Sequence, residues 1–238
     1  MKQISKWYYD EFKQVGVNYA DIEEVQAYDL RMQKLRNIKQ ECEYIRGLLN
    51  IKSSDCILEI GTGTGELALD FSAYCRKVIA VDVSPTMIEL AQEKAKSRNK
   101  INVLFQKAGF LTYENTEGFD AIITQLSLHH LPDYWKMIAL RRIYEMLKDG
   151  GKFYLRDVVF PSQIKDYDGY FKEIISGLRK ITDEKIAEET EIHIKEEFST
   201  LDWIMEGLLK SAGFNIEQVN YYDGFMANYL CIKNEHGV

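Results

Sequence analysis

Three glycines at alternate positions, Gly61, Gly63 and Gly65, directly follow a short apolar run that ends at Ile60. Glycine lets the backbone turn tightly and approach a ligand that a Cβ atom would block. The segment that begins at Glu66 reads as a helix, and a helix points its unpaired amino-terminal N–H groups into the same space. The pattern predicts a loop that holds a nucleotide-like cofactor at the end of a strand.

An acidic residue completes this pattern. Asp82 ends the next apolar run, seventeen residues after Gly65, where a carboxylate can accept hydrogen bonds from both hydroxyls of a ribose. A dinucleotide is one alternative. However, the strict G-x-G-x-x-G fingerprint fails from Gly61, because Glu66 occupies the third glycine position. If the fingerprint is started at Gly63, it is met only with Ala68 at the third glycine position.

Three further residues could take part in chemistry. His129 and His130 follow the fourth apolar run, and Asp157 lies near the end of the fifth. Open α/β sheets build their sites at such carboxyl ends, so these residues are the candidates for a catalytic base. The structural alternatives are that the histidines cap the next helix or shape the pocket, and that Asp157 forms an ion pair with Arg156.

The elements that must position these residues alternate between strands and helices. Near-continuous apolar strands separated by helices are typical of a parallel sheet buried on both faces. The sequence predicts a Rossmann-like, doubly wound α/β sheet. The strands are expected at residues 56–60, 77–81, 102–106, 119–124 and 152–159.

The two ends of the chain depart from this alternation. Residues 1–50 read as an amino-terminal helical cap, and residues 51–238 as the core, with a helical lid insertion at about 162–198. A further helix is expected from residues 199–200 to Gly213. Asp223 and Gly224 separate the last two strands and predict an antiparallel carboxyl-terminal hairpin. Aromatic residues of the cap and lid could cover a cofactor or a flat acceptor, namely Trp7, Tyr8, Tyr9, Phe12, Tyr19, Tyr167, Tyr170 and Phe171.

Four segments, in this order, resemble motifs of the class I S-adenosylmethionine-dependent methyltransferases. Residues 59–65 (EIGTGTG) are similar to the first motif, and residues 81–87 (VDVSPTM) to the second, which carries the ribose-binding acid. Residues 119–131 resemble the fourth-strand motif. Residues 147–153 (LKDGGKF) resemble the L-K-P-G-G turn, with Asp149 in place of proline. Within the family, the chain most resembles the branch that methylates quinones and other small molecules.

The resemblance implies S-adenosylmethionine as the cofactor and in-line methyl transfer to a small-molecule acceptor as the activity. One position departs from the family: Gly109 stands where an acid usually accepts from the adenine amino group. Adenine recognition is then expected to rest on the backbone N–H of Phe110 and on apolar packing. The cofactor-binding residues implied are Glu59, Gly61, Thr62, Gly63, Gly65, Asp82, Val83, Met87, Gly109, Phe110 and Gln125.

Two other functions stay open. An NAD(P)-dependent oxidoreductase of the short-chain type would need a Tyr-x-x-x-Lys pair, a spacing that Tyr144 and Lys148 match at the end of an expected helix. A catalytically inactive module that binds S-adenosylmethionine would suit the missing acid at Gly109. The sequence specifies neither the acceptor nor the oligomeric state.

Composition excludes several other classes. The net charge of −7 argues against a nucleic-acid partner, and no apolar run approaches the roughly 20 residues of a membrane span. The amino terminus lacks a signal-peptide pattern, so a cytoplasmic protein is expected. The four cysteines form no C-x-x-C pair, and no carboxylate set for magnesium is evident. No metal site is therefore predicted.

Overall fold

The computed structural model describes residues 5–13, 15–16, 29, 32 and 36–234. Its centre is one eight-stranded sheet with the order β3-β2-β1-β4-β5-β8-β7, in which β6 pairs separately with β5. The strands are β1 (Cys56–Ile60), β2 (Lys77–Asp82), β3 (Val103–Lys107), β4 (Phe119–Gln125), β5 (Leu147–Phe160), β6 (Thr200–Leu201), β7 (Asn215–Tyr222) and β8 (Met226–Ile232).

Strand direction follows the sequence pattern. Strands β1 to β5 pair in parallel, whereas β8 runs antiparallel to both β5 and β7. Asp223 and Gly224 join β7 to β8 with φ angles of 54° and 76°, the left-handed conformations that Asp-Gly tolerates in a hairpin turn. The Rossmann-like sheet, mostly parallel with a carboxyl-terminal antiparallel hairpin, is confirmed.

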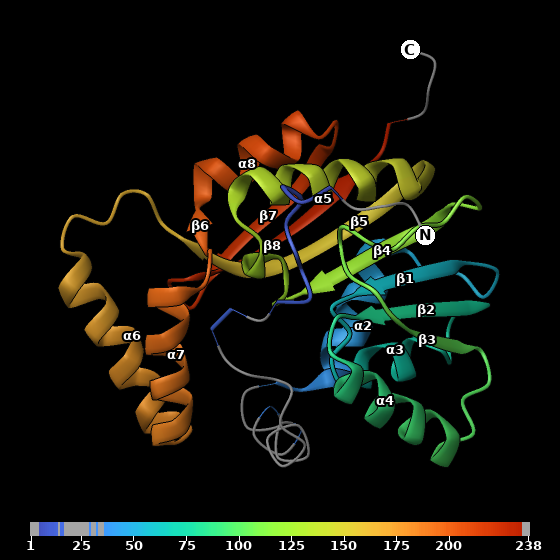
Figure 1. Ribbon diagram of the computed structural model, residues 1–238, viewed down its shortest axis with the longest axis horizontal. Helices are drawn as coiled ribbons and strands as arrows, with labels where there is room; N and C mark the ends of the chain where they lie inside the picture. Colours follow the sequence, from blue (N-terminus) through green and yellow to red (C-terminus); the bar gives the residue numbers. More distant parts are fainter. Residues whose placement is uncertain (1–4, 14, 17–28, 30–31, 33–35, 235–238) are drawn as a thin grey trace.

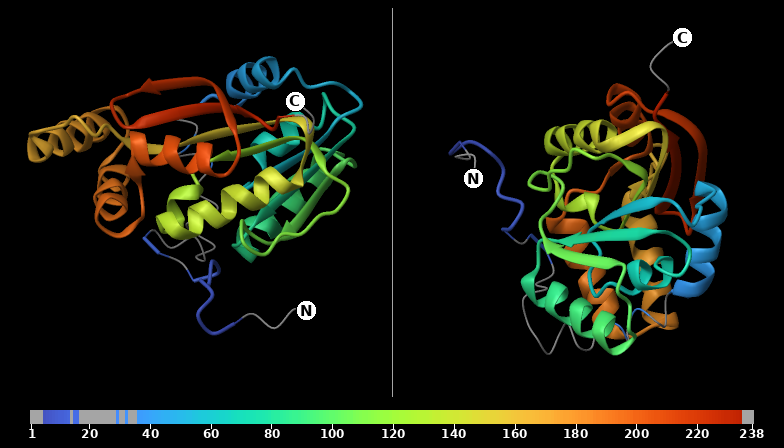
Figure 2. Two further views of the ribbon diagram at one scale, coloured as in Figure 1. Left: turned by 90° about the horizontal axis from the view of Figure 1, so that it is seen from above. Right: turned by 90° about the vertical axis from the view of Figure 1, so that its right-hand side faces the viewer.

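Helices cover both faces of this sheet (Figures 1 and 2). On one face, α2 (Ile38–Leu49), α3 (Glu66–Phe71) and α4 (Pro85–Ser97) pack around Ile57 and Val78. On the other, α5 (Asp133–Met146) and α8 (Asp202–Ser211) pack around Leu58 and Ile79. Neighbouring strand residues point to opposite faces, so each buried strand contributes to both cores.

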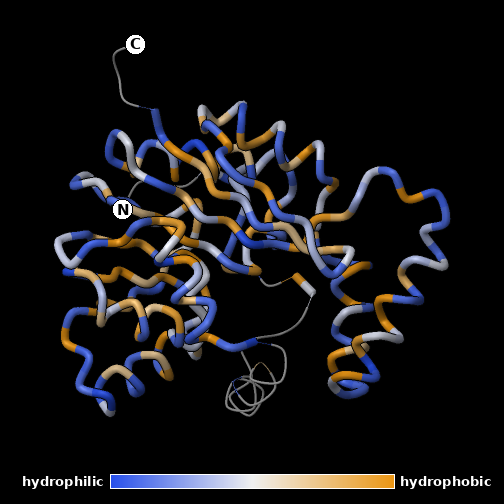
Figure 3. The backbone as a smooth tube through the Cα atoms, turned by 180° about the vertical axis from the view of Figure 1, so that it is seen from behind, coloured by the Kyte–Doolittle hydropathy of each residue, from blue (hydrophilic) through white to orange (hydrophobic). Residues whose placement is uncertain are grey.

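Two charged helices extend beyond the carboxyl end of β5. Helices α6 (Tyr167–Ile181) and α7 (Glu184–Glu196) pack against each other at the left of Figure 1. Apolar and polar residues alternate along both helices in Figure 3, and α6 has no buried residue. They occupy the segment predicted as a helical insertion at 162–198.

The amino-terminal segment differs from the helix expected over residues 1–50. Helix α2 accounts for the end of that range, but residues 5–13 form successive turns. Here tertiary packing overrides the local pattern, because Trp7, Tyr8 and Tyr9 contact the Trp135 ring on α5. The remainder of the range, including Tyr19, lies outside the described residues except for residues 15–16, 29, 32 and 36–37.

Two element boundaries also differ. Thr200 and Leu201 form strand β6 against Val159 and Phe160, so the helix expected from residues 199–200 begins at Asp202. Strand β5 begins at Leu147 and includes the glycine-rich turn. Among the described residues, no helix combines the length and apolar character needed to cross a membrane.

Candidate functional site

A cavity of about 670 Å³ opens at the carboxyl ends of β1, β2, β3 and β4. This volume is typical of small-molecule and cofactor sites. Of the residues predicted to bind a cofactor, all except Gly65 line the cavity: Glu59, Gly61, Thr62, Gly63, Asp82, Val83, Met87, Gly109, Phe110 and Gln125.

The three glycines of the loop serve different purposes. A Cβ atom on Gly61 would lie 1.8 Å from Oγ of Ser127, and one on Gly65 would lie 2.8 Å from the Phe105 ring. Nothing lies within 4 Å of the corresponding position on Gly63, which lines the cavity. Gly61 and Gly65 thus permit close packing, whereas Gly63 leaves space at the cavity wall.

Asp82 ties the loop to the end of β2. Its carboxylate accepts the backbone N–H groups of Gly63 at 2.8 Å and Ser84 at 2.9 Å. Burial raises the pKa of Asp82, against the lowering effect of these hydrogen bonds. A carboxylate has four lone-pair sites, so acceptor capacity remains for a ligand hydroxyl. Ser84 also caps α4 by accepting the N–H of Met87.

A second buried carboxylate lies at the base of the loop. Glu59, next to the end of β1, accepts a hydrogen bond from Oγ1 of Thr62 at 2.7 Å. Burial raises the pKa of Glu59 to about 7. A cationic group entering the cavity would therefore stabilise the ionised form of this carboxyl.

Gln125, the last residue of β4, presents a buried donor. Its Oε1 accepts from Arg36 at 3.1 Å, but its Nε2 has no hydrogen-bond partner among the described residues. A buried donor without a partner is costly, which favours a ligand oxygen here. Arg36 is anchored by Glu41 at 2.6 Å. Sequence reasoning missed Arg36 because it lies in a segment without motif character.

The third-strand end of the cavity is mainly apolar. Val83, Met87 and Phe110 line it beside Gly109. Glu11 also lines this end, although it comes from the amino-terminal turns. No local sequence signal marks Glu11, because only tertiary contacts bring residues 5–13 to the sheet.

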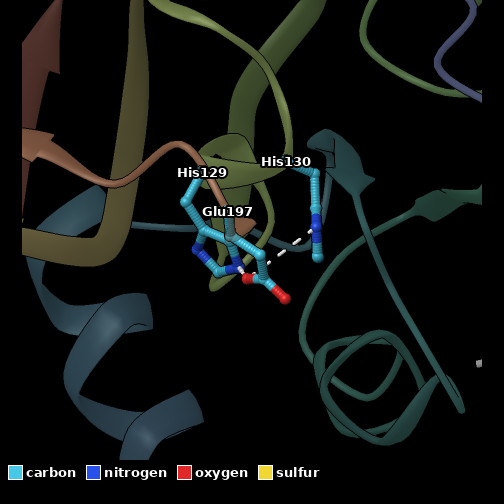
Figure 4. A group of neighbouring side chains, drawn as sticks. All are labelled: His129, His130 and Glu197. Atoms are coloured by element: carbon cyan, nitrogen blue, oxygen red, sulfur yellow. Dashed lines mark ion pairs between the residues drawn. The ribbon is translucent and has the colours of Figure 1, made fainter. Parts of the chain in front are cut away.

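The predicted catalytic residues belong to one polar cluster. Nδ1 of His129 lies 2.5 Å from Oδ1 of Asp157, and its Nε2 lies 3.2 Å from Oε2 of Glu197. Nδ1 of His193 lies 2.6 Å from the same oxygen of Glu197. Figure 4 shows His130 on the other side of Glu197, with Nδ1 at 3.9 Å from Oε2.

Only one member of this cluster reaches the cavity. His130 lines the cavity, whereas His129 and Asp157 lie behind it. Glu197 and His193 were not predicted as site residues, because they follow the candidate histidines by more than sixty positions. The fold of α7 brings them to the 3₁₀ turn at Leu128–His130.

Mutual electrostatics favour the ionised forms of His129, Asp157 and Glu197. Burial alone would lower the pKa of His129, but Asp157 and then Glu197 raise it to about 9. Burial would raise the pKa values of both carboxyls, yet His129 lowers that of Asp157, and His129 and His193 lower that of Glu197. Burial, followed by the charge on His129, lowers the pKa of His130 to about 4. Burial and the positive charge on His129 thus lower the pKa of His130, so that the His130 ring is neutral at neutral pH.

Two of the structural alternatives, a helix cap and a pair with Arg156, do not match the contacts, whereas His130 does line the cavity, as the pocket-shaping alternative predicts. Arg156 pairs with Glu41 at 2.9 Å on the α2 side of the sheet, because alternation directs it away from the Asp157 side. Pro132 is the N-cap of α5, with no side-chain cap bond, so neither histidine caps this helix.

The same cluster contains a set of possible metal ligands that the sequence did not indicate. One donor atom each from His129, His130 and Glu197 lies within 4.8 Å of the others. In the structure, both ring nitrogens of His129 already face carboxylate oxygens. A proton on this imidazole therefore supplies the positive charge that a metal ion would otherwise bring.

The pair expected of a short-chain oxidoreductase does not lie at the cavity. Tyr144 packs its ring against Phe214, and Lys148 binds Asp120 at 2.7 Å. Neither Tyr144 nor Lys148 lines the cavity.

Sequence comparisons agree with this geometry. Residues 57–151 match a family model described as a methyltransferase domain. The chain is 31% identical over 182 residues to the uncharacterized methyltransferase YcgJ of Bacillus subtilis, a match that covers 74% of this chain and 63% of YcgJ. It is 27% identical to the demethylmenaquinone methyltransferase of Lactococcus lactis, over 75% of this chain and 73% of that protein.

Solved structures share this fold. An S-adenosylmethionine-dependent methyltransferase from Clostridium acetobutylicum superposes with a TM-score of 0.67 at 15% identity. The superposition covers 89% of this chain and 98% of that protein. At this identity the likeness concerns the fold.

We expect the glycines to differ in their importance for stability. Gly65→Ala should lower the free energy of unfolding by about 2–4 kcal/mol, because a left-handed residue gains a Cβ against Phe105 and Ala91. Gly63→Ala, with φ of 55° and open space around it, should lose only about 1–2 kcal/mol. Urea unfolding measures both values, and equal losses would contradict the assignment.

The ion cluster should make stability depend on pH. The raised pKa of His129 contributes stability that is complete below about 6.5 and is lost as the pH rises through about 9. Asp157→Asn should therefore cost about 3–5 kcal/mol at pH 6, with a smaller difference from wild type at pH 9.5.

Urea unfolding at the two pH values tests this expectation. Asp168→Asn is the matched control, because it breaks an exposed pair with Lys172 and should leave the pH dependence as in wild type. A penalty for Asp157→Asn that is the same at both pH values would refute the linkage.

Proposed function

The chain belongs to the class I S-adenosylmethionine-dependent methyltransferases, and we propose that it transfers a methyl group from this cofactor to a small-molecule acceptor. The observation that carries the proposal is the single cavity wall formed by Gly61, Gly63 and Asp82 at the ends of β1 and β2. The match spans less than two thirds of YcgJ, so the support rests chiefly on this chain's own residues.

The residues present fit the cofactor. Asp82 keeps acceptor capacity for the ribose hydroxyls after binding Gly63 and Ser84. Glu59 suits the ammonium group of the methionine portion, and Arg36 its carboxylate. Nε2 of Gln125, which has no hydrogen-bond partner within the described part of the chain, supplies a donor for an oxygen at the same end.

The cofactor supplies an electrophilic methyl group on a positively charged sulfur. The remaining task of the protein is to align the acceptor with this group and to exclude water. His130 lines the cavity beyond the glycine loop, and its low pKa leaves a neutral ring that can accept a hydrogen bond. We assign His130 the role of positioning the acceptor's O–H or N–H group. Burial and the charged His129 ring, which Asp157 holds in place, keep His130 in its neutral form.

We further infer a cap and a lid around the core of residues 51–238. The amino-terminal segment contacts α5 through Trp135, which supports a covering role for residues 1–50. Residues 162–198 bring His193 and Glu197 to His129, which supports a lid role for this insertion. A lid that carries part of the polar cluster would help to exclude water from the transfer step.

The acceptor is proposed to be small and partly apolar. Leu131 lines the cavity near His130, and Phe110 lines its opposite end. In addition, one relative is a demethylmenaquinone methyltransferase. Quinols and phenols are therefore the first acceptors to screen. The net charge of −7 disfavours nucleic acid. The four cysteines are unpaired and buried, which suits a reducing cytoplasm.

Titration calorimetry with S-adenosylhomocysteine, NADH and NADPH tests the cofactor. We expect micromolar binding of S-adenosylhomocysteine alone, and Asp82→Asn should weaken it by about 1–3 kcal/mol because a charged hydrogen bond to a ribose hydroxyl is lost. Asp120→Asn, which changes an acid that does not line the cavity, is the control. Binding of NADH or NADPH alone would contradict the methyltransferase proposal and favour an oxidoreductase.

Substitution of His130 tests the acceptor end. His130→Ala should reduce kcat/KM by about 10²-fold or more while S-adenosylhomocysteine binds as in wild type. His130→Gln keeps a hydrogen-bond acceptor and should recover part of the activity. Full activity in His130→Ala would return this residue to a structural role.

Two further measurements separate the alternatives. Turnover on any acceptor excludes a catalytically inactive binding module. Activity that is lost on chelation and restored by zinc would assign His129, His130 and Glu197 to a metal ion instead of to hydrogen bonding.

A further inference from the structure

The space above Gly109 is filled by a side chain from the opposite end of the sequence. A Cβ atom on Gly109 would lie 2.5 Å from Oε2 of Glu11 and 2.8 Å from Cγ1 of Val83. Gly109 stands where related enzymes are expected to carry an acid. Here a carboxylate is present at that place in space, but residue 11 supplies it.

The Glu11 carboxylate is held in a fixed position. Its Oε2 accepts the backbone N–H of Leu111 at 2.9 Å, and its Oε1 accepts from Oγ1 of Thr112 at 2.6 Å. Thr112 in turn accepts the N–H of Gly109 at 3.0 Å. Glu11 is 9% exposed, so its orientation depends on these bonds and not on solvent.

The surrounding turns are anchored independently of this carboxylate. The hydroxyl of Tyr9 donates to the backbone oxygen of His130 at 3.2 Å. The ring of Tyr8 packs edge-on against Trp135, with centroids 4.8 Å apart. Residues 8–11 therefore extend from the acceptor end of the cavity to the end beside β3.

The free acceptor sites of Glu11 match one part of the cofactor. Each oxygen has two lone pairs and accepts one bond from Leu111 or Thr112, while the side chain lines the cavity. With the ribose at Asp82 on β2, the next space toward β3 lies between Val83, Met87 and Phe110. A flat base fits such apolar walls, and adenine carries an exocyclic amino donor at its edge.

We propose that Glu11 recognises the adenine of the cofactor. Its carboxylate accepts a hydrogen bond from the exocyclic amino group of adenine, in place of the acid missing at Gly109. This inference rests on the proposed function. It makes the amino-terminal segment part of the cofactor site and adds a carboxylate acceptor to the Phe110 N–H and apolar packing expected from the sequence.

The test compares two ligands that differ at this edge of the base, where inosine also carries an N1–H in place of the adenine N1 acceptor. S-inosylhomocysteine carries a carbonyl oxygen where S-adenosylhomocysteine carries the amino group. Wild type should bind the adenosine compound about 10- to 100-fold more tightly, the range expected for a hydrogen bond to a charged group. Calorimetric titration of the full chain with each ligand gives the ratio.

Glu11→Gln should change this ratio without a large change in shape. Its amide oxygen can accept the Leu111 N–H in place of Oε2, and its amide nitrogen, in place of Oε1, can donate one N–H to Oγ1 of Thr112 and the other to the inosine carbonyl. Binding of S-adenosylhomocysteine should weaken at least about tenfold, and binding of S-inosylhomocysteine should strengthen. Tyr9→Phe is the matched control, since it loosens the same segment away from the base and should leave the ratio unchanged.

The outcomes are separable. If Glu11→Gln weakens both ligands by the same factor, or leaves both unchanged, Glu11 has only a structural role and the inference is wrong. If wild type binds neither ligand, the proposed function itself fails. A ratio that shifts in Glu11→Gln but not in Tyr9→Phe establishes the inference.

Discussion

The site depends on the reversal of strand order beside β1. Strand β2 lies on one side of β1 and β4 on the other, so the connecting helices pass to opposite faces and leave a crevice at the carboxyl ends. The glycine loop after β1 enters this crevice, and its N–H groups bond to the end of β2. The other residues that line the cavity are positioned around this crevice.

Three buried carboxylates in and behind the cavity differ in their hydrogen-bond partners. Asp82 is satisfied by backbone N–H groups, Glu59 by one hydroxyl, and Asp157 by an imidazolium. These partners have different consequences. Asp82 keeps lone pairs for a ligand, the pKa of Glu59 is raised to about 7, and the carboxylate of Asp157 holds His129 beside His130. Burial costs free energy in all three cases, and specific partners offset that cost.

Segments distant in sequence complete both ends of the cavity. The amino-terminal turns bring Glu11 to the end beside β3, and the end of α7 brings Glu197 to the histidines. A Cβ on Gly16 would lie 2.0 Å from Glu197, so the amino-terminal segment also packs against the polar cluster. The amino-terminal turns and the end of α7 are thus built into the same site as the sheet residues.

The sequence alone determined the sheet and the cavity wall formed by the glycine loop and Asp82. Periodicity, the glycine loop and Asp82 are local signals, because strand, turn and capping residues act within a few positions of one another. The sequence did not determine the conformation of residues 5–13, the partner of Asp157, or the positions of Glu11 and Glu197. These depend on contacts between segments that are about 30 to 100 residues apart, whose free energy is realised only when the sheet has formed. Tertiary structure therefore decided which polar groups meet at the His130 end of the cavity and at the end beside β3.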